Sequence, residues 1–355
     1  MLIAVAAVVA IAVFVLLVRR YPPPRVLLYG VLTAALSAVV AIVAVAAFDL
    51  YLHQRYFRSG GYNIWGYRGT PPGKKRPGER RLAVLGGSVA FGYGVDVDET
   101  IPAYLRQELP DRTVINLAWN SEAAYSFPTT LDDYAYLGSD EVVLYSGYND
   151  LFEPNHNVFR HTSPIFVLTG YLPILPIIPM SVWLHLSDLS QSSRVIFEPT
   201  LADRASARAT AAANHVQLMI NAQLSRFTKQ QPRPQATDNE CGPTWSFYCE
   251  AVRQSVIAAR ARGLEVFVVG EPAVSKTYVD ALAAAHAKQQ AGLSQAIAHW
   301  FGTDPHVHRI SLGTSVDLGD PSLCYDGLHL TAKGNRQAAQ ALGAALRPIL
   351  AGLRH

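Results

Sequence analysis

The chain has 355 residues, half of them hydrophobic, and carries a formal net charge of +3 at pH 7. That length allows one domain with a sizeable core and a further segment. The small, dispersed positive charge argues against a nucleic-acid partner. The three cysteines form no Cys-x-x-Cys pair of the kind that holds zinc.

Two uncharged apolar stretches, residues 2–18 and 26–48, begin the chain. Each is long enough, or nearly so, to cross a bilayer as a helix, so we predict two transmembrane helices within residues 1–52. The connector RRYPPPR at 19–25 is basic, and short basic loops stay in the cytoplasm, which places both ends of the chain outside it. A cleaved signal peptide is the alternative, but it needs a basic region before the first stretch, and the first basic residue is Arg19.

Residues 53–80 are predicted to be a linker. The basic run GKKRPGERR at 73–81 lies in a connector that is rich in proline and glycine, and we interpret it as a solvated segment rather than a binding site. The pattern of the sequence changes directly after it. The extracytoplasmic domain is therefore expected to begin at residue 81.

From residue 81 to 355, short β-branched runs alternate with amphipathic stretches. The expected strands are 81–86, 112–118, 141–147, 264–270 and 306–312, and the expected helices are 100–108, 129–137, 205–229, 248–262, 276–301 and 331–350. Strands that are apolar on both faces and alternate with helices predict an α/β fold, a three-layer α/β/α sandwich around a parallel sheet. In such sheets, ligand sites form beyond the carboxyl ends of the strands.

An insert at about 155–200 interrupts this alternation. Its residues 164–184 are uncharged and long enough for a third span, but their four prolines argue against a regular helix. A span there would also separate Ser88 from His329, which are assigned below to one site. We expect either a proline-broken lid or an apolar surface that rests on the bilayer, with a core segment of a helical insert as the equal alternative.

Two further pairs of residues have spacings that suggest a bond or a ligand set. Cys241 and Cys249 are eight residues apart and could close a small loop outside the cell, which leaves Cys324 single. His306 and His308 would share one face of a strand, but no third ligand is visible in the sequence. We expect no metal there.

Four short blocks follow predicted strands: LGGSVAFGYG (85–94), NLAWNSEAAYS (116–126), SGYNDL (146–151) and CYDGLHLTAKGN (324–335). In the last block, Asp326 and His329 are three residues apart, so one loop can supply a general base and the carboxylate that orients it. Together with Ser88 they form a set of nucleophile, base and orienting acid.

These blocks, in this order, resemble those of the SGNH, or GDSL-like, hydrolase family, from about residue 81 to the C-terminus. The resemblance implies a flavodoxin-like sheet, ester substrates and no cofactor. It implies that Ser88 is the nucleophile and that His329 removes its proton and later returns one to the leaving group. Asp326 would hold the imidazole in the productive tautomer.

By the same resemblance, the oxyanion of the intermediate is held by the backbone N–H of Ser88, the side-chain amide of Asn149 and a backbone N–H from the second block. Counting from Asn116 assigns that last donor to Ser121. Three further residues have supporting roles: Gly87, Gly147 and Asp150.

The chain departs from the family in its first two blocks. Gly87 stands where the family's aspartate stands, and Ser121 stands where a glycine is usual. The aspartate supports the turn rather than the triad, and a backbone donor needs no particular side chain. The register of the second block leaves three other donors open: Ala118, Ala123 and Ala124.

We therefore expect a membrane-anchored serine esterase that acts outside the cytoplasm through an acyl-serine intermediate. The resemblance suggests O-acetylated glycans, lipids or small acyl esters as substrates, with the bilayer as a further partner. The same residues would serve acyl transfer to a sugar hydroxyl. A third hypothesis, motivated by the weakened first two blocks, is a catalytically silent protein that binds glycan or supports an envelope assembly. The sequence makes no prediction of an oligomeric state.

Overall fold

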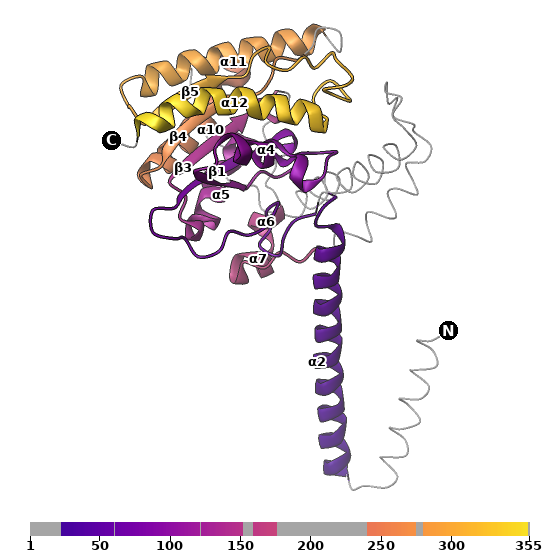
Figure 1. Cartoon of the computed structure of the whole chain (residues 1–355). Coiled ribbons are helices and arrows are strands. Elements are labelled where there is room, and N and C mark those ends of the chain that lie inside the picture. The colour runs from indigo at the N-terminus through magenta and orange to yellow at the C-terminus, as the bar shows by residue number, and fades with distance from the viewer. Residues whose placement is uncertain are drawn as a thin grey trace. The chain divides into compact units, whose positions relative to one another are not determined.

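The computed structural model describes residues 23–59, 61–120, 122–151, 159–175, 240–274 and 280–353. The chain divides into two compact units, residues 1–52 and 53–355, and each is described by itself. The second unit holds the sheet and most of the helices (Figure 1).

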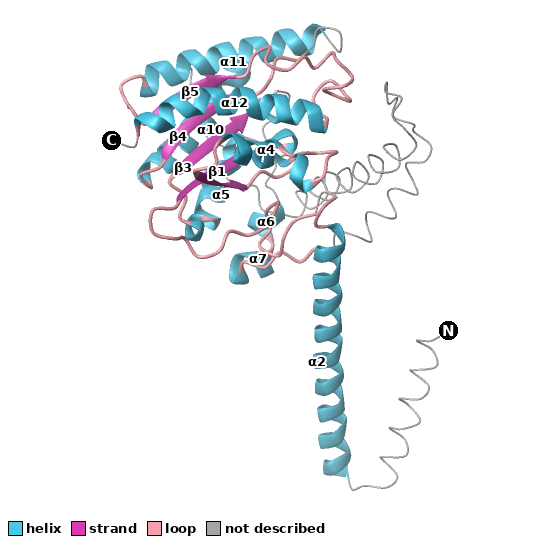
Figure 2. Ribbon diagram, viewed as in Figure 1, coloured by secondary structure: helices cyan, strands magenta, loops and turns pink. Residues whose placement is uncertain are grey.

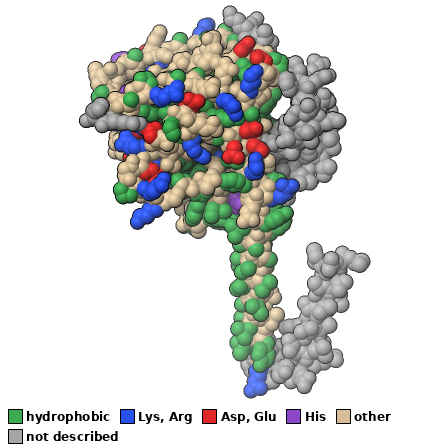
Figure 3. Space-filling view, in the orientation of Figure 1, with side chains coloured by type: hydrophobic (Ala, Val, Ile, Leu, Met, Phe, Trp, Pro, Cys, Tyr) green, Lys and Arg blue, Asp and Glu red, His purple; other side chains and the backbone are tan. Residues whose placement is uncertain are grey.

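The described residues of the first unit, 23–52, belong to helix α2 (Pro23–Tyr56), which is drawn as one unbroken helix in Figure 2 and whose last four residues belong to the second unit. Within its residues Leu27–Tyr56, an 18-residue window has a mean hydropathy of 2.6. At 1.5 Å per residue, residues Leu27–Tyr56 extend about 45 Å, which exceeds the bilayer's hydrocarbon core of about 30 Å. Apolar side chains cover this helix in Figure 3. It is the one helix among the described residues that is long and apolar enough to cross a membrane, although a signal sequence would meet the same criteria. The predicted span at 2–18 lies outside the described residues.

Five parallel strands form the sheet of the second unit, in the order β2-β1-β3-β4-β5. They are β1 (Arg80–Gly86), β2 (Arg112–Asn116), β3 (Glu141–Ser146), β4 (Glu265–Gly270) and β5 (Val307–Ser311). Every residue of β3 and β4 is buried, as expected for strands covered on both faces. The predicted parallel α/β sheet is confirmed.

The helices of this unit are α3 (Ser88–Phe91), α4 (Ile101–Glu108), α5 (Phe127–Asp133), α6 (Phe159–Thr162), α7 (Pro164–Thr169), α10 (Gly242–Ala261), α11 (Asp280–Phe301) and α12 (Ala332–Gly352). Helix α4 packs on α12, and α10 packs on both α5 and α11. Because crossovers between parallel strands are right-handed, the reversal of direction after β2 places these two groups on opposite faces of the sheet. The result is three layers. The predicted helix at 205–229 lies outside the described residues.

Two helix starts show how local sequence sets the boundaries. The hydroxyl of Thr100 accepts from the N–H of Ala103 at 3.2 Å and begins α4, and Thr331 caps α12 in the same way through Gly334. Helix α10 begins six residues earlier than the predicted Tyr248. Pro243 in its first turn favours that start, because proline is tolerated where no intrahelical N–H bond is needed.

Residues 53–80 were expected to form a linker, but they belong to the second unit. Tyr62 and Tyr67 are each 1 % exposed. The ring of Tyr62 stacks on that of Trp119 with 3.9 Å between centroids, and the ring of Tyr67 meets that of Tyr134 edge-on at 5.5 Å. Burial of these aromatic rings stabilises the segment against the domain, so the domain begins well before residue 81.

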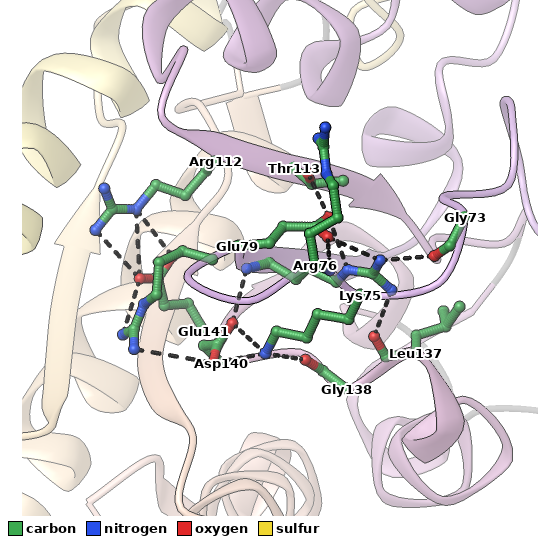
Figure 4. Close-up of polar contacts among 12 residues, drawn as sticks. Gly73, Lys75, Arg76, Glu79, Arg112, Thr113, Leu137, Gly138, Asp140 and Glu141 are labelled. Atoms are coloured by element: carbon green, nitrogen blue, oxygen red, sulfur yellow. Dashed lines mark hydrogen bonds and ion pairs between the residues drawn. The ribbon is translucent and has the colours of Figure 1, made fainter.

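The basic run at 73–81 was expected to be solvated. It instead takes part in a cluster of paired charges at the amino ends of β1, β2 and β3 (Figure 4). Lys75 Nζ lies 2.8 Å from Asp140, and the buried Arg81 pairs with Glu79 at 2.9 Å. We call this set the amino-end cluster; it comprises Lys75, Glu79, Arg80, Arg81, Arg112, Asp140 and Glu141. The run is therefore docked against the sheet rather than solvated.

Candidate active site

Ser88 follows β1 directly and begins the short helix α3. The turn between them contains Gly86 and Gly87, and a side chain at either position would meet its surroundings. A Cβ on Gly87 would lie 1.9 Å from the amide nitrogen of Asn149, and one on Gly86 would lie 2.8 Å from the carbonyl oxygen of Tyr145. Asn149 thus occupies the space that a side chain at position 87 would need, which gives a physical reason for glycine where the family has aspartate.

The structure brings Ser88, His329 and Asp326 into one chain of hydrogen bonds. Ser88 Oγ lies 2.9 Å from His329 Nε2, and His329 Nδ1 lies 2.5 Å from Asp326 Oδ2. The serine and the histidine are 241 residues apart in sequence. The geometry is that of a nucleophile, a base and an acid that orients the base.

Asp326 is held in its ionised form by its own loop. Burial would raise the pKa of this carboxyl, but hydrogen bonds from the ring and backbone N–H of His329 and from the backbone N–H of Leu328 outweigh burial and lower the pKa below its ordinary value. The two backbone bonds measure 2.7 and 3.0 Å. A carboxylate so fixed can stabilise an imidazolium on His329.

Two tyrosines hold the histidine loop against the serine loop. The ring of Tyr93 lies 4.4 Å from the ring of His329, and the hydroxyl of Tyr325 donates to the backbone carbonyl of Tyr93. Gly94 has a positive φ of 85°, and a Cβ there would meet the Tyr325 hydroxyl at 1.6 Å. Glycine is required at this position both for its backbone conformation and for the close approach of Tyr325.

Arg68, from the segment predicted as a linker, fixes the end of α3. Its guanidinium donates to the carbonyl oxygens of Phe91, Gly92 and Val95 at 2.9, 2.5 and 2.5 Å, and its side chain is almost fully buried. Arg68 thus supplies hydrogen-bond donors to the carbonyl that ends α3 and to two carbonyls in the loop after it. Burial lowers the pKa of Arg68 to about 10.

Asn149 lies in a single turn after β3 (Tyr148–Asp150). Its side-chain nitrogen donates to the carbonyl oxygen of Glu122 at 2.8 Å, which fixes the amide beside Gly87. Gly147 precedes this turn, and its carbonyl accepts from Gln289 at 3.1 Å. A Cβ on Gly147 would lie 2.7 Å from the amide nitrogen of Gln290, so a larger residue at this position would collide with that side chain.

Two buried carboxyls support the turn of Asn149. Asp150 accepts from the N–H of Ala124 at 3.4 Å, and burial raises the pKa of Asp150 to about 7. Glu271, which follows β4, accepts from the N–H of Tyr148 at 2.5 Å, and burial raises its pKa to about 8. Asp150 was predicted to be structural, whereas Glu271 carried no signal in the sequence because nothing local distinguishes it.

Ser121, the predicted third oxyanion donor, lies outside the described residues. Two of the alternative donors in the second block are already engaged. The N–H of Ala118 donates to the side chain of Asn116 at 3.1 Å, and the N–H of Ala124 donates to Asp150. Ala123 and Ser121 are the candidates that remain.

Sequence reasoning missed a buried ion pair behind this block. Glu122 and Arg160 are both fully buried and lie 2.8 Å apart. The hydroxyls of Ser126 and Thr130 donate to Glu122, and the Arg160 guanidinium lies over the ring of Trp119, 5.0 Å from its centroid. Burial would raise the pKa of Glu122, but Arg160 lowers it below its ordinary value. The pair joins α6 to the loop whose carbonyl holds Asn149.

The remaining predicted pairs lie elsewhere. His306 Nδ1 and His308 Nε2 both face Glu265, at 2.9 and 2.5 Å. Within the described ranges no group of three or more His, Cys, Asp or Glu side chains is arranged to hold a metal. A disulfide joins Cys241 to Cys249, and the thiol of Cys324 is buried.

Comparisons with known proteins give a consistent but distant likeness. No family model and no curated protein matches the chain. Solved structures that it resembles include a GDSL-like lipase from Bacteroides thetaiotaomicron (12% identity, TM-score 0.41, 79% of this chain and 93% of that one). Others are a putative acylhydrolase from Bacteroides fragilis (13%, 0.41, 79% and 91%) and a catalytic mutant of the acetylxylan esterase Axe2 from Geobacillus stearothermophilus (10%, 0.40, 76% and 94%).

Proposed function

We propose that the chain is a membrane-anchored serine esterase that removes acyl groups from oxygen esters through an acyl-serine intermediate. The observation that supports this most strongly is the chain of hydrogen bonds from Ser88 Oγ to His329 at 2.9 Å and from His329 to Asp326 at 2.5 Å. A buried serine bonded to an oriented imidazole is the arrangement that activates a hydroxyl as a nucleophile.

In the proposed reaction, His329 Nε2 takes the proton of Ser88 as Oγ forms a bond to the carbonyl carbon of the ester. Asp326 stabilises the imidazolium that results. The tetrahedral intermediate places its negative oxygen near the backbone N–H of Ser88 and the amide of Asn149, and each such donor contributes about 3 kcal/mol to stabilisation of the transition state. When the intermediate collapses, the alcohol leaves with the proton from His329.

Water then releases the acyl group. It attacks the carbonyl of the acyl-serine while His329 accepts its proton, and the proton returns to Ser88 Oγ as the carboxylic acid leaves. Transfer to a sugar hydroxyl differs only in the nucleophile of this second step. We infer O-acetylated glycans, lipids or small acyl esters as substrates, as the family resemblance of the sequence blocks suggests.

The proposed location is outside the cytoplasm, with residues 2–18 and α2 as two membrane spans. The disulfide between Cys241 and Cys249 supports it, because disulfides persist in oxidising compartments, and so does the basic connector at 19–25. A reporter enzyme that is active only outside the cytoplasm, fused after His355, should be active. An inactive but intact fusion would mean that the C-terminus lies in the cytoplasm and would contradict the proposed topology.

Labelling with a fluorophosphonate probe tests the nucleophile. We expect the full chain to be labelled and Ser88→Ala to be unlabelled, because the probe bonds to an activated serine oxygen. Ser311→Ala is the matched control, since Ser311 is an exposed serine at the carboxyl end of β5 on the same edge of the sheet. It should be labelled like the wild type.

Two outcomes would contradict the proposal. Labelling of Ser88→Ala would place the nucleophile elsewhere, and a folded but unlabelled wild type would favour a silent glycan-binding protein. For a chain that is labelled, an activated acetyl ester supplied with and without candidate sugars separates the two reactions. Acetate released to water indicates hydrolysis, and acetyl on the sugar indicates transfer.

A further inference from the structure

Three large apolar side chains on α7 are turned away from the core. Ile165, Val167 and Leu168 are 51%, 62% and 84% exposed, whereas Phe166 is buried and lies close to Gly66. Successive helical residues are rotated by about 100°, so the three exposed side chains share the side of α7 opposite Phe166. We call these three side chains the α7 face.

Exposed apolar side chains are few elsewhere in the described part of residues 53–355. The large ones are Trp65, Tyr136, Ile165, Val167, Leu168 and Ile257, so half of them belong to the α7 face. Trp65 adjoins it, because a Cβ on Gly170, which ends α7, would lie 3.7 Å from the Trp65 ring. Contiguous exposed apolar surface with an indole at its edge is typical of contact with a partner or a membrane rather than with water.

Hydrogen bonds within the second unit join the chain just after α7 to His53, the residue with which that unit begins. His53 Nε2 lies 2.9 Å from the carbonyl oxygen of Leu172, and His53 Nδ1 lies 2.8 Å from that of Tyr62. The N–H of Leu172 donates to the carbonyl of Ile64 at 2.9 Å. His53 follows the apolar part of α2 without a break in the helix. These bonds hold Leu172, and with it α7, within reach of the point where the candidate membrane span ends.

The charges near this point suit a lipid surface. Residues 162–184 contain no Asp, Glu, Lys or Arg, so nothing charged has to enter an apolar phase together with α7. Arg55 and Arg58 are exposed and follow His53 directly. Basic side chains beside a span attract anionic headgroups.

We infer that the α7 face is a membrane-contact surface: Ile165, Val167 and Leu168 enter the interfacial layer of the same bilayer that α2 spans. Interfacial helices place their apolar side chains roughly 5–10 Å into the boundary between headgroups and acyl chains. The contact would give the domain a second point of attachment beside its anchor. It does not depend on ester cleavage, so it goes beyond the proposed function.

The test uses the full chain in vesicles of phosphatidylcholine and phosphatidylglycerol. Leu168→Cys carries an environment-sensitive nitrobenzoxadiazole label, and the lipids carry a nitroxide near the headgroup end of one acyl chain. Leu168 is the most exposed of the three side chains, so the substitution leaves the packing of Phe166 intact. The wild type gives the labelling background, because its one free thiol, Cys324, is buried.

Ile257→Cys is the matched control, since Ile257 is an apolar side chain on α10 that is 41% exposed. We expect nitroxide lipids to quench the label at position 168 at least about twofold more than the label at 257, with a blue-shifted emission only at 168. Equal quenching at the two positions would overturn the inference. A blue shift at 168 without quenching would also overturn it, because it would mean that protein, from this chain or from a second copy, covers the α7 face. Neither readout involves Ser88, so the result is separate from that of the esterase test.

Discussion

The two ends of the sheet bury polar side chains in opposite ways. At the amino ends of the strands, the fully buried Glu141 lies 3.3 Å from Arg112 and 3.3 Å from Arg80, and Asp140 pairs with Lys75. Charge is balanced by charge throughout this amino-end cluster (Figure 4). Such pairing favours a fixed structure, because removal of either partner leaves an uncompensated buried charge.

At the carboxyl ends, Glu122 pairs with Arg160, but two other buried carboxyls have no such partner. Asp150 and Glu271 accept backbone N–H groups, and among the described residues neither has an ion-pair partner. Burial therefore raises the pKa of both. The amino end of the sheet is thus held together by paired charges, while the turn of Asn149 at the other end rests on two buried carboxyls whose protonated forms are favoured by burial.

The sharpest way to break this comparison is to remove a histidine from each end. We expect His329→Ala to lower the rate of ester cleavage by at least about 10³-fold with little change in Tm, because the base is lost while the fold is retained. His308→Ala, which removes a partner of Glu265 near the amino end of β4, should leave the rate within about twofold. Steady-state kinetics and thermal unfolding measure both, and similar losses in the two variants would contradict the division.

The next largest effect is expected at the amide of Asn149. Asn149→Ala should lower kcat by about 10²- to 10³-fold with little change in KM, because in the proposed mechanism the amide contacts the oxyanion and not the bound ester. Its bond to the Glu122 carbonyl is also lost, so Tm has to be compared. A variant in which KM rises while kcat is unchanged would assign Asn149 to substrate binding.

For the amino-end cluster the expectation is reversed. Glu141→Ala should lower the free energy of unfolding by about 3 kcal/mol, because it leaves the buried Arg112 with only the part-exposed Asp111 as an ion-pair partner in the described part of the chain. The kcat of the molecules that remain folded should be unchanged. Denaturant unfolding and kinetics below Tm test this, and a stable variant with a lowered kcat would show that the two ends are coupled.

The smallest effect is a dependence of stability on pH at Glu271. The pKa of this carboxyl is about 8 in the folded chain against an ordinary value near 4.5, so the folded chain holds the proton more tightly. This contribution to stability is complete below about pH 4 and is lost as the pH rises to 8. Glu271→Gln cannot lose a proton, so the variant should gain on the order of 1 to 3 kcal/mol relative to the wild type between pH 5 and pH 8.

Thermal unfolding at the two pH values measures this gain. Glu108→Gln, on the surface of α4 where Glu108 pairs with Arg347, is the control and should follow the wild type at both. A Glu271→Gln variant that follows the wild type as well would mean that Glu271 is ionised in the folded chain.

Much of the fold could be predicted because its signals are local. Each strand is a short β-branched run between turn residues, and Thr100 and Thr331 precede their helices directly. The pairing of Asp326 with His329 is also local, since both belong to one loop. Ser88, however, is joined to them only through the order of blocks that the family resemblance supplied, because spacing alone does not bring residues 241 apart together.

What could not be predicted depends on contacts across the fold. Glu122 and Arg160 are 38 residues apart, and nothing in a single sequence shows which acid meets which base. The packing of residues 61–69 did leave a signal in the run GYNIWGYRG, where three aromatic residues within nine are unusual for a solvated linker. The predicted span at 2–18, most of the insert and Ser121 itself fall outside the described residues.

The long separation between serine and histidine has a consequence for synthesis. Ser88 leaves the ribosome 241 residues before His329 does. At about 5–20 residues per second, that interval lasts roughly 10 to 50 s. In the proposed mechanism, a partly made chain holds Ser88 throughout that time without the base that activates it, so the chain cannot yet cleave an ester.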